Sequence, residues 1–245
     1  MFLISRKNRN AMLVCIVFLL VFTLFSFFRT SFHSADTAVN LWIVAIHADV
    51  AIFIAKIISV VFDTTSISIL TLLMAIFLFI KKRKAMGLLL IVAVGGSVVS
   101  VAILKSLTAV ARPANQLLFS SGFSYPSGHS VCVIVFIGLL TYFVWLNWCN
   151  SYRVKTMSLM FFVLMTAIVS FDRIYLNVHW LSDIVGGCLF GTFCLSFFIV
   201  LYERLKLVGV FETKWFNLVA NVTFILSVVA VVSLGLIDFL GYLSL

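Results

Sequence analysis

The sequence predicts an all-α, polytopic transmembrane helical bundle that forms one domain over residues 1–245. Composition is the first reason: 64% of the residues are hydrophobic and 10% are charged, whereas soluble domains have about 45–50% apolar and about 25% charged residues. Uncharged apolar runs of about 20 residues recur along the chain, and a helix of that length crosses the hydrocarbon core of a bilayer. Lysine and arginine are concentrated in alternate gaps between these runs, as the positive-inside rule describes.

Seven helices are expected to cross the membrane. The first six would form a core over residues 11–202, and the seventh would be an additional C-terminal helix near residues 215–240. The first run follows a basic start, as in a signal peptide. It is longer than a usual signal-peptide core and no small-residue cleavage site follows it, so we expect an uncleaved helix. The expected spans are Ala11–Phe28, Ser59–Ile80, Ala85–Leu104, Ser130–Tyr152, Thr156–Phe171, Ile184–Tyr202 and Trp215–Ile237.

The segment Trp42–Val61 is apolar but is not expected to cross the membrane. It carries His47, Asp49 and Lys56, each of which is costly near the bilayer centre. Counting it as a span would also place the basic cluster 81–84 on the outer side, against the charge rule. We therefore expect a helix that lies in the outer interface, with its tryptophan at the level of the lipid headgroups.

The net charge is +9, and the membrane topology explains where most of the basic residues lie. No nucleic-acid partner is therefore expected. Twelve of the 17 basic residues fall in gaps that would face the cytoplasm, which puts the N-terminus inside and the C-terminus outside. These residues are Arg6, Lys7, Arg9, Lys81, Lys82, Arg83, Lys84, Arg153, Lys155, Arg204, Lys206 and Lys214.

Two kinds of small residue are expected to serve helix packing. The cysteines have neither the spacing of a metal site nor that of a disulfide framework. Gly187 and Gly191 have a small-xxx-small spacing, which favours tight contact between helices within the bundle. The five cysteines are Cys15, Cys132, Cys149, Cys188 and Cys194.

Three short polar segments carry the chemistry-bearing residues on the outer side. They are Lys105–Pro113, Pro126–His129 and Arg173–Asp183, and they contain both prolines, two of the four histidines and three of the five remaining basic residues. The topology brings all three segments to the same face of the membrane.

Together the segments suit an anionic phosphate. Arginine offers a bidentate fork and lysine a point charge, and a turn that contains glycine offers backbone N–H groups. One histidine could attack phosphorus while the other protonates the leaving oxygen. His179 and Asp183 are four residues apart, so at the start of a helix the carboxylate could hold the imidazole.

The segments resemble the three-part signature of the type 2 phosphatidic acid phosphatase family of membrane lipid phosphatases. The first part is Lys105 followed after six residues by Arg112-Pro113, and the second is Pro-Ser-Gly-His at 126–129. The third has Arg173, His179 and Asp183 at the family spacing. The surrounding helices follow the six-helix plan of that family, and the run from Trp215 is an addition to it.

Asp172 stands where the family's third motif usually has serine. A carboxylate beside a phosphate site would repel the substrate unless it turns away or pairs with a neighbouring cation. We expect activity to survive, with an altered rate or substrate preference.

The resemblance implies a role for each motif residue. His179 would be the nucleophile that forms a phosphohistidine, Asp183 would orient it, and His129 would protonate the leaving group and then activate water. The phosphate would be bound by Lys105, Arg112, Arg173 and the backbone N–H groups of Ser127 and Gly128. No metal and no cofactor is expected. The constellation is also similar to that of vanadium-dependent haloperoxidases, which are soluble proteins.

The expected substrate is a lipid phosphate in the outer leaflet of a bacterial inner membrane. The candidates are undecaprenyl pyrophosphate, which is the preferred one, phosphatidylglycerophosphate, phosphatidic acid and a lipid A phosphate. A phosphotransferase that passes the phosphoryl group to a second lipid is the alternative, and a lipid-binding protein or transporter is a third. The oligomeric state stays open.

Overall fold

The protein is described by a computed structural model that covers residues 6–147 and 151–243, and this part of the chain is helical, without strands. Two short 3₁₀ turns, η1 (Arg29–Phe32) and η2 (Val210–Glu212), connect longer helices. The α-helices are α1 (Arg6–Phe27), α2 (His33–Ala45), α3 (Asp49–Val61), α4 (Thr64–Ile80), α5 (Lys84–Thr108), α6 (Gly128–Asn147), α7 (Tyr152–Tyr175), α8 (Leu181–Leu207) and α9 (Lys214–Leu243).

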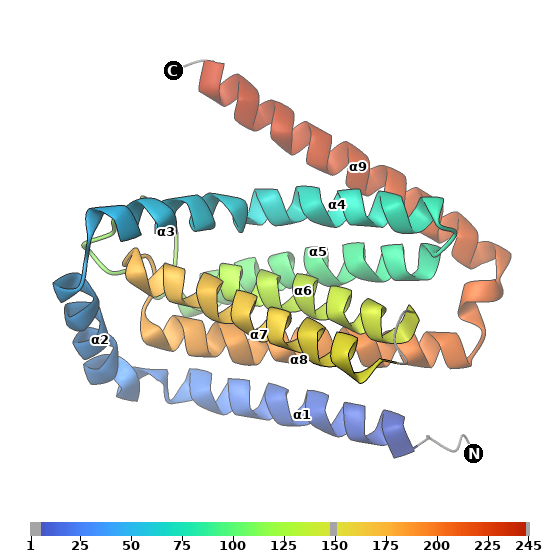
Figure 1. Cartoon of the computed structure of the whole chain (residues 1–245), viewed down its shortest axis with the longest axis horizontal. Coiled ribbons are helices and arrows are strands. Elements are labelled where there is room, and N and C mark those ends of the chain that lie inside the picture. The colour runs from blue at the N-terminus through green and yellow to red at the C-terminus, as the bar shows by residue number, and fades with distance from the viewer. Residues whose placement is uncertain (1–5, 148–150, 244–245) are drawn as a thin grey trace.

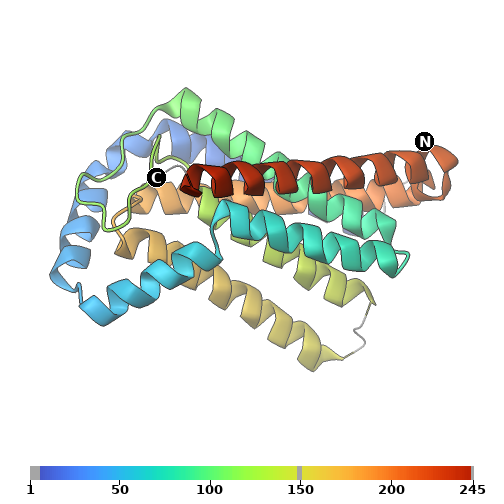
Figure 2. The same cartoon turned by 90° about the horizontal axis from the view of Figure 1, so that it is seen from above.

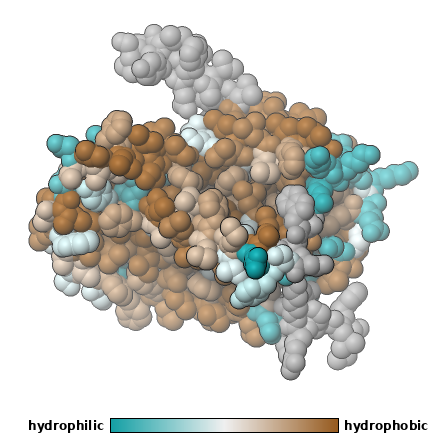
Figure 3. Space-filling view, in the orientation of Figure 1, coloured by the Kyte–Doolittle hydropathy of each residue, from teal (hydrophilic) through white to brown (hydrophobic). Residues whose placement is uncertain are grey.

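The long helices form the predicted transmembrane bundle. Within the described residues, six helices are long and apolar enough to cross a membrane, and α3 with α4 form a further pair bent by 47°. α9 is the predicted additional helix, and it packs on α4 and α5 near its start and then diverges from the bundle (Figure 1). Hydrophobic side chains cover the middle of the molecule, and hydrophilic ones gather toward its two ends (Figure 3). The fold is therefore that of a polytopic helical membrane protein.

The segment 42–61 is not the single helix that we predicted. It breaks at residues 46–48, and Tyr175 contacts two residues of the break. The carbonyl of Tyr175 lies 2.9 Å from Nε2 of His47, and its hydroxyl accepts the N–H of Ala48 at 3.1 Å. α2 crosses the end of the bundle, whereas α3 leads into α4 (Figures 1 and 2). The side chain of Asp63 accepts the N–H of Thr65 at 3.2 Å and so caps the start of α4. Because an N-cap residue has a non-helical backbone, α3 ends before Asp63.

Several other helices extend beyond their predicted ends. α7 begins at Tyr152, so Arg153 and Lys155 lie in its first turn rather than in a loop. α8 runs on to Leu207 and carries Arg204 and Lys206 in its last turn. Long basic side chains at a helix end can place their charges in the headgroup region. The positions of the charged residues therefore predicted where each apolar run ends, but not where each helix ends.

α6 is the central helix, and α8 packs closely against it. In the apolar window of α6, 61% of the residues are buried, compared with 11% in the windows of α1 and α7. A Cβ atom on Gly187 would lie 2.8 Å from the carbonyl oxygen of Ser127, and one on Gly191 would lie 3.1 Å from Cα of Val131. The prediction of tight packing at these two glycines is confirmed. The contact fixes the start of α6 against α8.

The two ends of the bundle differ in composition. The end that carries α2, the loop 109–127 and the α7–α8 connection is called the site end, because it contains the three motif segments (Figure 1). The opposite end, called the basic end, contains the α4–α5 turn with Lys81–Lys84 and the last turn of α8. The predicted basic clusters of these two elements thus lie away from the motif segments.

Candidate active site

The three motif segments converge on a cavity of about 260 Å³ at the site end. α5 ends in a left-handed residue, Ala109 (φ +50°), and the following loop brings Arg112 back over the helix end. Asp63 and Thr64, at the break between α3 and α4, complete one wall. The predicted residues that line the cavity are Lys105, Arg112, Gly128, His129 and His179.

His179 and Asp183 form the contact that their spacing predicts. Nδ1 of His179 lies 3.3 Å from Oδ2 of Asp183, and neither side chain is more than 3% exposed. Oδ2 also accepts the backbone N–H of Trp180 at 2.8 Å, which holds the carboxylate in the first turn of α8. Asp183 therefore fixes one ring nitrogen of His179 and leaves Nε2 on the side of the cavity.

Two cations lie on the Nε2 side of His179. Nη1 of Arg112 is 3.4 Å from Nε2 and donates to the carbonyl of Val178 at 2.7 Å. Nζ of Lys105 donates to the carbonyl of Phe123 at 2.7 Å. These partners are neutral carbonyl oxygens, so they orient the two cations without neutralising them, and the cavity keeps a positive potential suited to an anion.

The same surroundings control the protonation of His179. Burial, and then the charges of Lys105, Arg112 and Arg173, lower the pKa of this imidazole well below its ordinary value of 6.5. His179 is therefore neutral at neutral pH. A neutral imidazole with Nδ1 held by a carboxylate presents a lone pair at Nε2, which is the form that a nucleophile needs.

His129 lies in the first turn of α6 between a cation and a carboxylate. Its Nε2 is 3.2 Å from Nη1 of Arg173 and 3.6 Å from Oδ1 of Asp63. His129 therefore has one cation and one carboxylate within reach of the same ring nitrogen.

Asp172 pairs with its neighbour Arg173. Such pairing with a cation is one of the two arrangements in which a carboxylate at this position was expected not to repel the substrate. Its Oδ2 accepts Nε of Arg173 at 2.9 Å and Nη2 at 2.6 Å. Nη2 also donates to the hydroxyl of Ser59. Each of the three guanidinium nitrogens of Arg173 thus has a partner, counting Nη1 on His129. The arginine therefore contacts His129 directly, and its predicted role in binding phosphate stays a prediction.

Ser127 does not offer the backbone N–H group that we predicted for phosphate binding. That N–H donates to the carbonyl of Asp183 at 3.0 Å, and the side chain is fully buried against Ser130. Close packing of α6 on α8 explains this use, because Ser127 joins the two helix starts. Gly128 is the first residue of α6 and lines the cavity, so its N–H is among those without an intrahelical acceptor.

Sequence reasoning missed several residues that hold the site together. Nη2 of Arg29 lies 3.5 Å from Oδ1 of Asp183, and its guanidinium stacks over Tyr125. Asp36 accepts both the N–H and the hydroxyl of Ser182, at 2.8 and 2.7 Å. In the sequence, Arg29 and Asp36 are visible only as charges on the outer side of the first helix. They are too far along the chain from Asp183 and Ser182 for any spacing pattern to connect them. Asp63 and Ser59 were missed for the same reason.

The titratable side chains of the described residues do not form a cluster typical of a metal site. Among the residues whose positions are described, no three His, Cys, Asp or Glu side chains converge as metal ligands. Cys149 lies outside the described residues, and the four described cysteines are unpaired thiols. Metal independence stays a prediction.

The fold and the cavity define a class: an integral membrane protein with a buried histidine–carboxylate pair beside uncompensated cations. Residues 84–207, just over half of the chain, match the PAP2 superfamily, and the chain belongs to that family. All three motif segments lie within the matched residues. The family resemblance stated from the motifs is thereby confirmed.

Two curated proteins and one solved structure are similar to this chain. The phosphatidylglycerophosphatase B of Bacillus subtilis (strain 168) is 29% identical over 124 residues, which are 50% of this chain and 60% of that protein. An undecaprenyl-diphosphatase of Sulfolobus acidocaldarius is 29% identical over 140 residues, 53% of this chain and 61% of that protein. The chain thus matches about three fifths of the length of each relative.

The structural neighbour shares the fold. It is the crystal structure of a transmembrane PAP2-type phosphatidylglycerolphosphate phosphatase from Bacillus subtilis, with a TM-score of 0.71 and 23% sequence identity. The similarity covers 78% of this chain and 96% of that one. A transmembrane neighbour of this extent supports the assignment of the chain as an integral membrane protein.

Proposed function

We propose that this protein is a lipid phosphatase that hydrolyses a phosphate monoester or diphosphate of a membrane lipid. The observation that carries the proposal is the His179–Asp183 pair, with a neutral imidazole whose Nε2 lies beside Arg112 in an electropositive cavity. Family membership and the names of the two relatives support the same class of reaction.

The first step is the transfer of the phosphoryl group to His179. Nε2 attacks phosphorus, the bond from phosphorus to the leaving oxygen breaks, and His129 gives that oxygen a proton. Asp183 stabilises the positive charge that develops on the ring through its contact with Nδ1. Lys105 and Arg112 neutralise the phosphoryl oxygens, and such preorganised charge supplies most of the acceleration in phosphoryl transfer.

The second step returns the enzyme to its starting state. His129, now neutral, takes a proton from water, and the resulting hydroxide attacks the phosphohistidine. The bond between phosphorus and Nε2 breaks and inorganic phosphate leaves. Arg173 and Asp63 act on this step through His129, whose ring lies between them.

The same features support a proposal for the membrane face and the substrate. The basic end lies opposite the cavity, so the positive-inside rule favours a cavity on the outer face, which in a bacterial cell is the periplasmic side of the inner membrane. Undecaprenyl pyrophosphate and phosphatidylglycerophosphate are the leading substrates, because the relatives are named for phosphatases of these lipids. Phosphatidic acid and a lipid A phosphate complete the set to be tested.

The test is the release of inorganic phosphate by purified protein in detergent with excess EDTA. The four lipids are offered separately, and His179→Ala is the blank. We expect release from at least one lipid and its loss in the variant. Consumption of a lipid without phosphate release, seen only when an acceptor lipid is present, would indicate a phosphotransferase. No reaction by folded protein would refute catalysis.

A further inference from the structure

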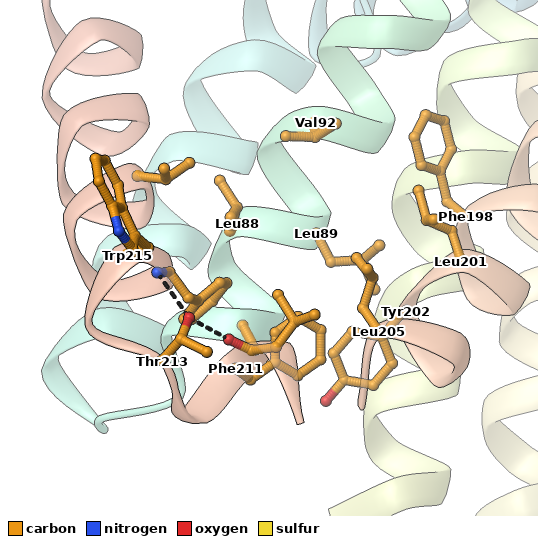
Figure 4. A pocket seen from close by; sticks show the side chains of 14 residues that line it. Leu88, Leu89, Val92, Phe198, Leu201, Tyr202, Leu205, Phe211, Thr213 and Trp215 are labelled. Carbon is orange, nitrogen blue, oxygen red and sulfur yellow. Dashed lines mark hydrogen bonds between the residues drawn. The ribbon is translucent and has the colours of Figure 1, made fainter. Parts of the chain in front are cut away.

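A second lipid-binding feature lies at the basic end, away from the catalytic cavity. An apolar groove of about 360 Å³ runs between α5, α8, η2 and the first turns of α9. Figure 4 shows Leu88 and Val92 of α5 facing this space, with Phe198 of α8 and Trp215 of α9 on opposite sides. Counting 1.5 Å per helical residue along α5, Lys84 and Lys105 are roughly 30 Å apart, so the groove does not belong to the catalytic cavity.

The groove offers a ligand almost no polar surface. Thr213 is the one lining residue with an aliphatic hydroxyl, and that hydroxyl accepts the N–H of Phe216 at 3.1 Å and donates to the carbonyl of Val210 at 2.8 Å (Figure 4). The groove also opens sideways, since Trp215 is 76% exposed and Val92 is 43% exposed. A site of this size and lining suits hydrocarbon chains from the surrounding bilayer.

The groove continues into a cationic cavity at the end of the bundle. This second cavity has a volume of about 620 Å³ and is lined by Lys82, Arg83 and Lys84 of the α4–α5 turn. Among its described lining residues none is acidic. The two cavities share four wall residues, which are Ala85, Tyr202, Phe211 and Phe216. An amphiphile could therefore occupy both at once.

We propose that this composite site binds an anionic phospholipid from the leaflet opposite the catalytic face. Its phosphate would lie at the Lys82–Lys84 turn, and its acyl chains would lie along Leu88 and Val92 toward the membrane centre. The order of charge and hydrocarbon along the groove matches that of such a lipid, and basic residues at the membrane surface attract anionic headgroups. A zwitterionic lipid or a detergent would fill the apolar part without using the three cations.

The bound lipid would also hold the base of α9 to the bundle. α9 contributes Trp215 and Phe216 to the groove and diverges from the bundle farther along (Figure 1). A lipid in this position would bridge α9 to α5 and α8. The proposal does not depend on the catalytic activity, because no residue of the composite site touches the phosphatase cavity.

The test is lipid retention measured by native mass spectrometry. Protein is reconstituted in bilayers of phosphatidylcholine and phosphatidylglycerol, extracted in mild detergent, and the retained lipids are counted. Lys82→Gln/Lys84→Gln removes two of the cations. Lys206→Gln/Lys214→Gln is the matched control, since it makes the same charge change at the same end with residues that line neither cavity.

We expect the wild type and the control to retain phosphatidylglycerol in preference to phosphatidylcholine, and the Lys82/Lys84 variant to retain it at least about tenfold less. Leu88→Trp, which fills the groove but leaves the charges, should also lose the lipid, whereas Leu20→Trp on the exposed face of α1 should not. Equal retention in all variants, or no preference for the anionic lipid, would overturn the proposal. Unchanged unfolding temperatures serve as the check on folding, independent of any phosphatase assay.

Discussion

At the scale of single residues, the imidazole of His179 lies between charges of opposite sign. Asp183 contacts Nδ1 and Arg112 approaches Nε2, so the ring is oriented on one side and faces a cationic environment on the other. The cations and the burial favour the neutral imidazole. In the proposed reaction, the negative charge of the substrate would offset the cations and so help the ring to accept a positive charge during attack.

The lowered pKa of His179 predicts the acid limb of the pH–rate profile. The neutral ring of His179 is the reactive form in the proposed mechanism, and its folded pKa lies below 6.5, so the midpoint of the acid limb of kcat/KM should lie below pH 6.5. Lys105→Gln removes one of the charges that lower this pKa, so its acid limb should move to higher pH although its overall rate is reduced. A wild-type limb at or above pH 6.5, or a limb that does not move in the variant, would contradict this account.

The pair of Asp172 and Arg173 predicts a phosphate-dependent change in stability. Asp172→Asn leaves a buried arginine without its carboxylate, which should destabilise the protein by about 3 kcal/mol. Inorganic phosphate could replace the missing carboxylate, so it should raise the unfolding temperature of the variant more than that of the wild type. Asp49→Asn, at an exposed carboxylate of α3, is the control. An equal effect of phosphate on all three proteins would show that Arg173 does not reach a bound anion.

At the scale of elements, the start of α6 is positioned by its contact with α8. Ser127 donates its N–H to Asp183, and Gly187 leaves room for the carbonyl of Ser127. The helix starts that carry the candidate catalytic residues His129 and Asp183 are therefore joined by a backbone hydrogen bond. A small displacement between the two helices would change the distance between His129 and His179.

Gly187→Ala should test this coupling. The added methyl group would lie 2.8 Å from a backbone oxygen, so the start of α6 has to shift, and a misplacement of about 1 Å can lower a rate by about 100-fold. We expect kcat to fall by about 10- to 100-fold. Gly95→Ala, whose Cβ would meet nothing within 4 Å, should retain full activity. Equal activity in the two variants, measured as phosphate release, would argue against a rigid junction at this position.

The positions of the helices could be predicted where the length of an apolar run determined them. The junctions between helices could not be predicted from the sequence. Lengths of apolar sequence located the spans, including the additional α9. The break at residues 46–48 depends on Tyr175, which is distant in the sequence, so a local pattern could not reveal it. The site followed the same rule: motif spacing identified His179 and Asp183, whereas Arg29 and Asp63 reach the site only through the packing of α1 and of the α3–α4 bend.

At the scale of the whole molecule, charge separates the two ends of the bundle. The cavity lies at one end, and the α4–α5 turn with the last turn of α8 lies at the other. Because lysine and arginine favour the cytoplasmic side, this polarity supports the proposed orientation, in which the cavity would have access to lipids of the outer leaflet. The apolar girdle between the ends is consistent with a substrate that reaches the cavity from the membrane.

This orientation predicts which positions are accessible from each side of the membrane. In a variant without native cysteines, Ser34→Cys in the exposed part of α2 should react with an impermeant thiol reagent added outside intact cells. Lys206→Cys, also exposed but at the basic end, should react only after the membrane is opened. The reverse pattern would place the cavity in the cytoplasm and remove the outer-leaflet lipids as substrates.

The central claim is that His179 carries the phosphoryl group, and the most direct measurement is to trap that intermediate. Purified protein in EDTA is mixed with a lipid substrate labelled in the transferable phosphoryl group, quenched under alkaline conditions that preserve phosphohistidine, and mapped by peptide mass spectrometry, with His179→Ala as the blank. The account predicts label on His179 that is stable in base, labile in acid and absent from the blank. Label on His129, or phosphate release with no labelled histidine at any time, would contradict it.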